Sequence, residues 1–448
     1  MKLYWNRGDY DWQPERYKYS VEQMMLTLFP GERPEYPQEP AGAGEDWARF
    51  AVTPGKTWVT VTAQVAREGR EALGRARFPR QKLDEPQEKV YHTLQHGLKM
   101  AFYRAGVTLL GQEPPWGALT GVRPVKLPTR AMLAGATPKQ AQRELERDFH
   151  VSPVRAALAV DCAKASLAVD KDLREDQVSV YIGVPFCPTR CAYCSFVSAD
   201  VGRTLKLVEP YLEGVLREIA VTGESLRRAG KTVHSLYVGG GTPTTLSASQ
   251  LSQLLEAVRR DLPVEGCVEY TVEAGRPDTI DREKLLALKA AGIGRISINP
   301  QTLEDEVLRA IGRRHSARDI LDAYALAREV GFDSINMDLI AGLPRDSFEG
   351  FCRSLNGVLE LAPENITVHT LALKKGSRLM EQGGALPSGE ETARMLDYSL
   401  EQLGGRGYLP YYLYRQKYMS GSLENVGWCL SGQESVYNIV MMEELQTV

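Results

Sequence analysis

The sequence lacks any run of about 18 consecutive apolar residues, the minimum for a membrane-spanning helix. Residues 1–7 also lack the apolar core of a secretory signal. Charge of one sign is not in excess, because the formal net charge is only −3 over 448 residues. That balance favours no broad attraction to nucleic acid. We therefore expect a cytoplasmic protein that has neither a membrane nor a nucleic acid as its partner.

Complete pairing of the cysteines into disulfides is excluded, because the chain has seven of them. In a large cytosolic chain, closely spaced cysteines indicate metal ligands before they indicate disulfides. No internal repeat is present. The composition, 43% hydrophobic and 25% charged, is that of a globular protein. At about 100–200 residues per domain, the length predicts two or three domains.

Residues 1–172 are expected to form an α+β accessory domain. Apolar and polar residues alternate over 57–62, which is typical of a strand. Apolar residues recur at every fourth position within 86–105 and predict an amphipathic helix. Two more helices are expected near 138–149 and 153–169. The Pro-, Gly- and Glu-rich segment 29–54 is expected to be a long loop, and no motif here indicates a chemistry.

Residues 173–385 alternate short apolar strands with helical stretches. Strands are expected at 178–182, 235–238, 269–272, 295–298, 334–339 and 365–368. Helices are expected near 210–228, 247–260, 282–291, 304–311, 317–330 and 348–360. The alternation predicts an α/β fold with a parallel sheet and right-handed crossovers, and six units make a partial (β/α)6 barrel. Binding and reacting residues of such a barrel lie at the carboxyl ends of its strands.

Three cysteines, Cys187, Cys191 and Cys194, follow the first of these strands in the spacing Cys-x3-Cys-x2-Cys. Three thiolates on one loop can bind three irons of a [4Fe–4S] cluster and leave the fourth iron open. An open iron can bind S-adenosylmethionine (SAM), from which electron transfer releases a 5′-deoxyadenosyl radical. Structural zinc is the alternative, but it takes four ligands. The nearest other thiols, Cys162 and Cys267, are isolated and, like Cys352 and Cys429, are expected to pack in the core.

Glycines at residues 239–241, followed by Thr242-Pro243, end the second predicted strand. Glycine lets the backbone approach a ligand closely and leaves its N–H and C=O groups free to bind. A tight turn from strand to helix would contain the same glycines. Because this turn follows the next strand after the cysteine loop, we expect its backbone to meet the methionine part of SAM.

These motifs resemble those of the oxygen-independent coproporphyrinogen III oxidase family, the HemN-like radical SAM enzymes. The resemblance rests on residues 181–187 with the later cysteines and on 239–243, and it continues in order over 178–376. Segments 115–124, 187–196 and 411–417 are similar to the HemZ-type branch of that family. Residues 386–448 then correspond to the start of a HemN-type C-terminal domain, which is expected to be short and incomplete.

The resemblance implies ligands for SAM at matching positions. The SAM bound to the cluster would be contacted by Tyr181, Gly240, Glu273 and Ala372. A second SAM would be held by Tyr193, Gly241, Thr242, Gln301, Arg313 and Asp338. Carboxylates and amides can bond ribose hydroxyls or an ammonium group, and a guanidinium can hold a carboxylate. No catalytic residue is expected beyond the ligands of the cluster and of SAM; His369 is a candidate for facing the cavity, and His315 is expected at the surface.

The resemblance also implies an activity, the oxidative decarboxylation of coproporphyrinogen III to protoporphyrinogen IX in oxygen-independent heme biosynthesis. Its partners would be the tetrapyrrole and a reduced flavodoxin- or ferredoxin-type electron donor. The anionic propionates of that substrate favour basic residues at the barrel mouth, with Arg313, Arg314 and Lys374-Lys375 as candidates. Phe196 stands where the founding oxidases carry a further cysteine. A heme-binding chaperone and a radical SAM enzyme for another tetrapyrrole remain alternatives.

Overall fold

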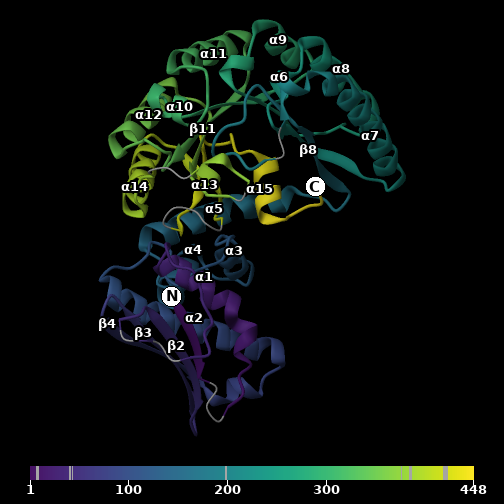
Figure 1. Cartoon of the computed structure of the whole chain (residues 1–448). Coiled ribbons are helices and arrows are strands. Elements are labelled where there is room, and N and C mark those ends of the chain that lie inside the picture. Colours follow the sequence, from purple (N-terminus) through teal and green to yellow (C-terminus); the bar gives the residue numbers. More distant parts are fainter. Residues whose placement is uncertain are drawn as a thin grey trace. The chain divides into compact units, whose positions relative to one another are not determined.

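The computed structural model describes residues 1–6, 10–39, 42, 44–196, 199–374, 376–382, 386–416 and 422–448. The chain divides into two compact units, Met1–Leu158 and Ala159–Val448 (Figure 1). The helix α5 (Pro153–Asp172) spans the division in the sequence. None of the helices in the described part of the chain combines the length and the apolar character that a membrane span requires.

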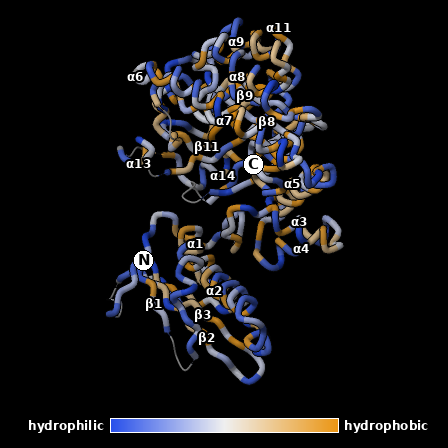
Figure 2. The backbone as a smooth tube through the Cα atoms, turned by 90° about the vertical axis from the view of Figure 1, so that its right-hand side faces the viewer, coloured by the Kyte–Doolittle hydropathy of each residue, from blue (hydrophilic) through white to orange (hydrophobic). Residues whose placement is uncertain are grey.

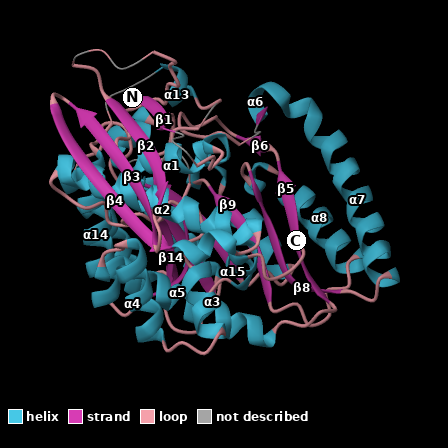
Figure 3. Ribbon diagram, turned by 90° about the horizontal axis from the view of Figure 1, so that it is seen from below, coloured by secondary structure: helices cyan, strands magenta, loops and turns pink. Residues whose placement is uncertain are grey.

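The first unit is built on a four-stranded sheet whose strands lie side by side in chain order (Figure 3). Its strands are β1 (Lys2–Asn6), β2 (Trp47–Pro54), β3 (Trp58–Arg67) and β4 (Arg70–Pro79). β1 runs parallel to β2, and the other neighbours are antiparallel. Every second residue of β4 is buried from Ala72 onward, so one face of the strand meets the core.

Helices α1 (Lys18–Leu28) and α2 (Gln87–Leu110) supply the other half of that core. Gly74 of β4 allows α2 to approach, because a Cβ atom there would lie 1.9 Å from the carbonyl oxygen of Ala101. Helices α3 (Lys126–Leu133) and α4 (Pro138–Phe149) follow. The expected strand near 57–62 and helices near 86–105 and 138–149 are confirmed.

The expectation of one long loop over 29–54 is wrong at its end, because Trp47–Pro54 forms β2. Ala48, Phe50 and Val52 are buried in this strand, and it pairs with β3 along its whole length. The alternation was present in the sequence, but the Pro- and Gly-rich residues before it obscured it. Pairing with β3 supplies the hydrogen bonds that a short strand cannot form alone.

The second unit is built on an eight-stranded sheet of which six strands are parallel and follow chain order. These strands are β5 (Gln177–Val184), β8 (Thr232–Gly240), β9 (Glu269–Gly275), β10 (Arg295–Gln301), β11 (Ser334–Ala341) and β12 (Asn365–Thr370). Apolar segments run through the interior along β8, β9 and β11 (Figure 2). All six predicted strands are confirmed.

Helices cover the convex side of this curled sheet in an arc (Figure 1). They are α7 (Val208–Arg228), α8 (Ala248–Asp261), α9 (Arg282–Ala290), α10 (Asp305–Ala310), α11 (Ala317–Val330), α12 (Phe348–Leu361) and α14 (Gly389–Gly405). Ser247 and Ser316 begin α8 and α11 with capping boxes, which end the preceding loops sharply. The six strand–helix units form the predicted partial (β/α)6 barrel.

The C-terminal residues extend the barrel sheet. β14 (Asn425–Cys429) pairs antiparallel with β12, and β13 (Leu409–Tyr414) pairs with β14. The last helix, α15 (Val436–Glu443), brings Tyr437 onto the ring of Tyr237 with 4.7 Å between the ring centroids. These elements belong to the same compact unit as the barrel. Division of the chain at 172 and 385 stays a prediction, and residues 383–385 lie outside the described residues.

Candidate active site

A cavity of about 330 Å³ lies at the carboxyl ends of the parallel strands. Its lining combines the loop after β5 with the ends of β8 to β12 and with residues of β13 and β14. The cavity brings together every residue that the sequence predicted for the cluster and for SAM. They are Cys187, Cys191, Cys194, Tyr181, Tyr193, Gly240, Gly241, Thr242, Glu273, Gln301, Arg313, Asp338 and Ala372.

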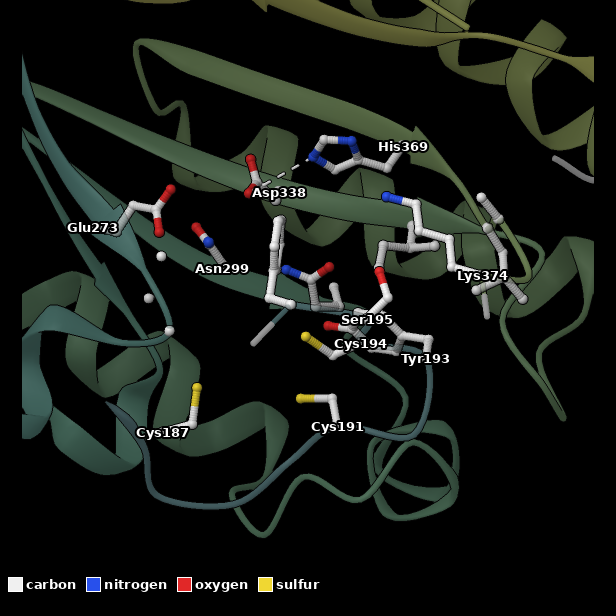
Figure 4. A pocket seen from close by; sticks show the side chains of 18 of the residues that line it. Cys187, Cys191, Tyr193, Cys194, Ser195, Glu273, Asn299, Asp338, His369 and Lys374 are labelled. Atoms are coloured by element: carbon white, nitrogen blue, oxygen red, sulfur yellow. Dashed lines mark ion pairs between the residues drawn. The ribbon is translucent and has the colours of Figure 1, made fainter. Parts of the chain in front are cut away.

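The three cysteines of the loop point into the same space (Figure 4). Cys191 is buried, while Cys187 and Cys194 are partly exposed, and none of the seven cysteines, all of which the structure describes, forms a disulfide. Within the described ranges, no three His, Cys, Asp or Glu side chains converge tightly enough to hold a single metal ion. A cluster presents a separate iron to each thiolate, so the donor set fits a cluster better than one tetrahedral zinc.

The other cysteines lie outside this cavity, as expected. Cys162 and Cys429 are buried, which confirms the prediction that they pack in the core. Cys267 and Cys352 are only partly buried. Burial raises the pKa of the Cys267 thiol to about 11, so this cysteine stays protonated at neutral pH.

Backbone contacts fix the cysteine loop to the segment after α10. The Ala192 N–H donates to the carbonyl oxygen of Ile311 at 2.9 Å, and the Thr189 hydroxyl donates to that of Gly312 at 3.2 Å. Arg313, which follows, donates to the Tyr193 hydroxyl at 3.3 Å. Burial opposes the charge on Arg313, but Tyr193 and Cys191 outweigh burial and hold its pKa above the usual range.

The glycine that follows β8, Gly241, has a packing role that the sequence did not indicate. The Gly241 and Thr242 N–H groups donate to the carbonyl oxygens of Val184 and Phe186, each at 2.7 Å. A Cβ atom on Gly241 would lie 2.5 Å from the Phe186 oxygen. Glycine is therefore required for β8 to end against the strand that leads into the cysteine loop. Thr242 then reaches Cys187, with 3.5 Å between Oγ1 and Sγ.

Glu273 lies near the end of β9, in the cavity lining, and accepts a hydrogen bond from the Tyr237 hydroxyl at 2.7 Å. Burial raises the pKa of Glu273 to about 7, and the bond from Tyr237 opposes that rise. The Tyr237 ring stacks in turn on Tyr437 of α15. The sequence analysis missed both tyrosines. Tyr237 carried a signal, because it lies two residues before Gly239 and so faces the same side of β8.

Asp338 of β11 and His369 of β12 face each other across the cavity wall, with 3.8 Å between Oδ2 and Nε2 (Figure 4). Asn336 also donates to Asp338 at 2.7 Å. Burial opposes ionisation of Asp338, but the neighbouring His369 holds its pKa below the ordinary value. The hypothesis that His369 faces the cavity is confirmed. The expectation of a surface His315 is wrong, since this side chain is buried and lies 3.4 Å from Asp278.

Gln301 is held in an unusual backbone conformation at the end of β10. Its φ of +69° lies in the left-handed region, and its side chain is buried in the cavity lining. The register of β10 against its neighbours shifts just before it. Non-glycine residues in this region cost about 1–3 kcal/mol and concentrate at functional sites. The strained position therefore supports a binding role for Gln301.

The mouth of the cavity carries Lys374 and Phe196. The Lys374 ammonium lies 5.9 Å from the centre of the Phe196 ring, and that ring is 64% exposed. Of the other basic candidates, Arg313 lines the cavity, whereas Arg314 is exposed and is not part of the lining. Lys375 lies outside the described residues. Lys374 is thus the basic group best placed to meet an anionic substrate.

The lining also contains residues that the sequence reading did not single out. The wall beside His369 is formed by Tyr414 of β13, by Gln416, which follows β13, and by Asn425 of β14. Tyr414 and Gln416 belong to the segment 411–417 that is similar to the HemZ-type branch, but that similarity did not place them at the cavity. Their nearness to the cysteine loop depends on β14 pairing with β12.

Comparison with known proteins places the chain in a family. The model of the radical SAM superfamily matches residues 181–355. The oxygen-independent coproporphyrinogen-III oxidase-like protein HemZ of Bacillus subtilis is 43% identical over 343 residues, covering 75% of this chain and 68% of that protein. The chain belongs to the HemN-like radical SAM family. The cofactors of this family are a [4Fe–4S] cluster and SAM, as the cysteine motif predicted.

The HemN-like family also includes proteins named heme chaperones. The heme chaperone HemW of B. subtilis is 35% identical over 239 residues, which cover 52% of this chain and 62% of that protein. The structure of coproporphyrinogen III oxidase (HemN) from Escherichia coli aligns with 55% of this chain and 56% of its own, at 31% identity and a TM-score of 0.48. Oxidase-like proteins and chaperones therefore share this family.

Proposed function

We propose that this chain is an oxygen-independent coproporphyrinogen III dehydrogenase, which converts coproporphyrinogen III to protoporphyrinogen IX. The observation that carries the proposal is the meeting of three cysteines with Glu273, Gln301 and Asp338 in one cavity at the strand ends. The 43% identity to the oxidase-like protein HemZ supports the choice of substrate.

In this proposal Cys187, Cys191 and Cys194 bind the cluster. Tyr181, Gly240, Glu273 and Ala372 would contact the SAM that binds with the cluster. Together the two bound groups supply a 5′-deoxyadenosyl radical. Glu273 would accept hydrogen bonds from the SAM ammonium, and a positive charge beside this carboxylate favours its ionised form.

A second SAM would bind to Tyr193, Gly241, Thr242, Gln301, Arg313 and Asp338. Asp338 is already ionised in its setting, because His369 and Asn336 stabilise the charged form, so it is ready to accept from ribose hydroxyls. Arg313 would hold a carboxylate, although it must share its donors with Tyr193 and Asn299.

The substrate carries anionic propionates, and Lys374 is proposed to bind one of them. Lys374 forms no ion pair with any of the described residues, so its ammonium is available. The reacting propionate would give a β-hydrogen atom to the 5′-deoxyadenosyl radical, and would then lose CO2 and pass one electron to an external one-electron acceptor to become a vinyl group. A reduced flavodoxin- or ferredoxin-type protein would supply electrons to the cluster.

The test is anaerobic reconstitution of the protein with iron and sulfide, followed by incubation with SAM, a reductant and coproporphyrinogen III. We expect 5′-deoxyadenosine together with tri- and dicarboxylated products, and neither in the Cys191→Ala variant. Cleavage of SAM without any loss of carboxylate would reject the substrate. Methylated tetrapyrrole would indicate a different radical SAM reaction.

The second candidate is a heme-binding chaperone, which the 35% identity to HemW favours. Heme titration of the same reconstituted protein separates the two. Stoichiometric heme binding without 5′-deoxyadenosine would support the chaperone, whereas turnover of coproporphyrinogen would exclude it as the main function.

A further inference from the structure

Arg276 lies directly after β9 and contacts the cysteine loop at Thr189. Its side chain is 3% exposed. The Nη1 atom donates to the Thr189 carbonyl oxygen at 3.0 Å and to the Thr189 hydroxyl at 2.8 Å. Thr189 is the middle residue of the three that separate Cys187 from Cys191, so Arg276 holds the loop between these two thiols.

The rest of the guanidinium is occupied by Asp278. Nε donates to Oδ1 at 2.9 Å and Nη2 donates to Oδ2 at 2.7 Å, which is a bidentate pair. With its fork engaged on both sides, Arg276 has a fixed orientation. It is therefore poorly placed to bind a substrate anion, although it reaches the cavity lining.

Asp278 connects this pair to a third loop. His315 lies 3.4 Å from it, and it follows closely after Gly312, the residue that accepts the Thr189 hydroxyl. The contacts therefore run from Thr189 to Arg276, from Arg276 to Asp278 and from Asp278 to His315. Residues 312–315 close the ring, because Gly312 accepts the Thr189 hydroxyl. This ring joins the loops after β5, after β9 and after α10. The same end of β9 carries Glu273, three residues before Arg276.

We infer that Arg276 is a positioning residue that sets the spacing of the Cys187 and Cys191 thiols before the cluster binds. A loop that is already ordered loses less conformational freedom when its thiolates bind metal, which favours cluster assembly. Asp278 and His315 act through Arg276 by holding its fork. The inference rests on the proposed ligand role of the cysteines but not on any particular substrate.

The test compares alkylation of individual cysteines in the reduced, cluster-free full-length protein, read by peptide mass spectrometry. In Arg276→Gln we expect Cys191 to react roughly fivefold faster or more, since local opening governs access to a buried thiol. Cys352, a partly exposed thiol on α12, serves as the internal reference and keeps its rate. Arg282→Gln is the matched control, because it removes an exposed arginine of α9 that pairs with Glu329.

Arg276→Lys distinguishes geometry from charge. Lysine keeps the charge but cannot engage Asp278 and Thr189 in fixed directions, so we expect it to behave like glutamine. Iron and sulfide bound after reconstitution should fall in both variants, while the melting temperature of the cluster-free protein changes no more than in Asp278→Asn. Wild-type alkylation in Arg276→Gln, or full recovery with lysine, would overturn the inference.

Removing one partner of a buried ion pair can prevent folding. Thr189→Val covers that case, because it leaves the Arg276–Asp278 pair intact and removes the hydroxyl that accepts from Arg276 and donates to Gly312. Thr189→Val should also speed Cys191 alkylation, and an unchanged rate in this variant would contradict the positioning role of Arg276. These measurements need no substrate, so a wrong substrate assignment leaves them unaffected. A wild-type protein that binds no iron would instead reject the cysteine ligands.

Discussion

The Tyr237–Glu273 pair shows how single side chains set the chemistry of this cavity. Burial favours the protonated carboxyl, while the Tyr237 hydroxyl, 2.7 Å away, favours the carboxylate. The balance leaves the pKa of Glu273 at about 7. A small change at either group therefore changes the charge of Glu273 at physiological pH. Stacking of Tyr437 on Tyr237 keeps the hydroxyl in place.

SAM affinity is expected to depend on pH through Glu273. Below about pH 7 the carboxyl is protonated and cannot stabilise the SAM ammonium, so affinity should rise as the pH increases from 6 to 8. Tyr237→Phe removes the bond that favours the carboxylate and should move this rise to higher pH. At pH 7 it should weaken SAM binding by about tenfold, the value of a hydrogen bond to a charged group.

Equilibrium dialysis of SAM against the reconstituted protein across this pH range measures the effect. Tyr408→Phe is the matched control, because its hydroxyl donates to the Pro363 carbonyl oxygen away from the cavity. A pH-independent affinity in the wild type would show that Glu273 does not contact the SAM ammonium.

Lys374 provides a second prediction at the residue scale. Lys374→Glu replaces an attraction for substrate carboxylate by a repulsion, and we expect KM for coproporphyrinogen to rise about tenfold through charge effects near the surface. SAM cleavage without substrate should stay as in the wild type. Steady-state kinetics of the variant against Lys206→Glu, an exposed lysine before α7, makes the comparison. Equal KM values for Lys374→Glu and Lys206→Glu would show that Lys374 does not contact the substrate.

At the scale of elements, the ends of neighbouring strands build the site together. β8 must end close to the segment after β5 so that Thr242 can reach Cys187, and only glycine at 241 permits that approach. The last residues of β9 place Glu273 in the cavity, and Arg276, directly after the strand, contacts the cysteine loop. The site therefore depends on strand pairing and on loops that are held by their neighbours.

Gly241→Ala tests this dependence. The new methyl group would meet the Phe186 carbonyl oxygen at 2.5 Å, so the backbone must shift. Overpacking of this kind costs about 1–3 kcal/mol of unfolding free energy, and we also expect less bound iron. Gly214→Ala in α7 is the control, because nothing lies within 4 Å of the added methyl group. Urea denaturation and iron analysis would contradict the packing role if both variants behaved alike.

At the scale of the whole molecule, the chain consists of two compact units with separate interiors. The first has its own core between the sheet and helices α1 and α2. Every residue that lines the active-site cavity belongs to the second unit. Ligands of the cavity should therefore stabilise one unit directly.

Calorimetry of the cluster-free and the reconstituted, SAM-bound protein tests this division. We expect two thermal transitions, since chains with separate cores depart from two-state unfolding. The cluster and SAM should raise the midpoint temperature of only one transition. SAM at 100 times its Kd adds about 2.7 kcal/mol to the unfolding free energy of that unit. A single transition that shifts as a whole would contradict independent units.

Much of the barrel was predictable because its signals are local. Strand and helix periodicity, the Cys-x3-Cys-x2-Cys spacing and the glycines at 239–241 each lie within a short stretch of chain. The parallel order of the strands then brings their carboxyl ends to one edge, so that the predicted residues meet in a single cavity. β2 was missed because its alternation follows directly on a segment rich in proline and glycine.

The cysteine loop, its place after the first barrel strand and the choice of radical SAM chemistry were determined by the sequence alone. The partners that hold this loop were decided only by the tertiary structure. Arg276, Asp278 and His315 carry no motif, and they meet Thr189 because separate loops converge at the strand ends. Tyr414 and Asn425 likewise reach the cavity through the pairing of β13 and β14, and Tyr437 reaches the ring of Tyr237 through the packing of α15. Contacts between distant residues depend on register and packing, which no local pattern encodes.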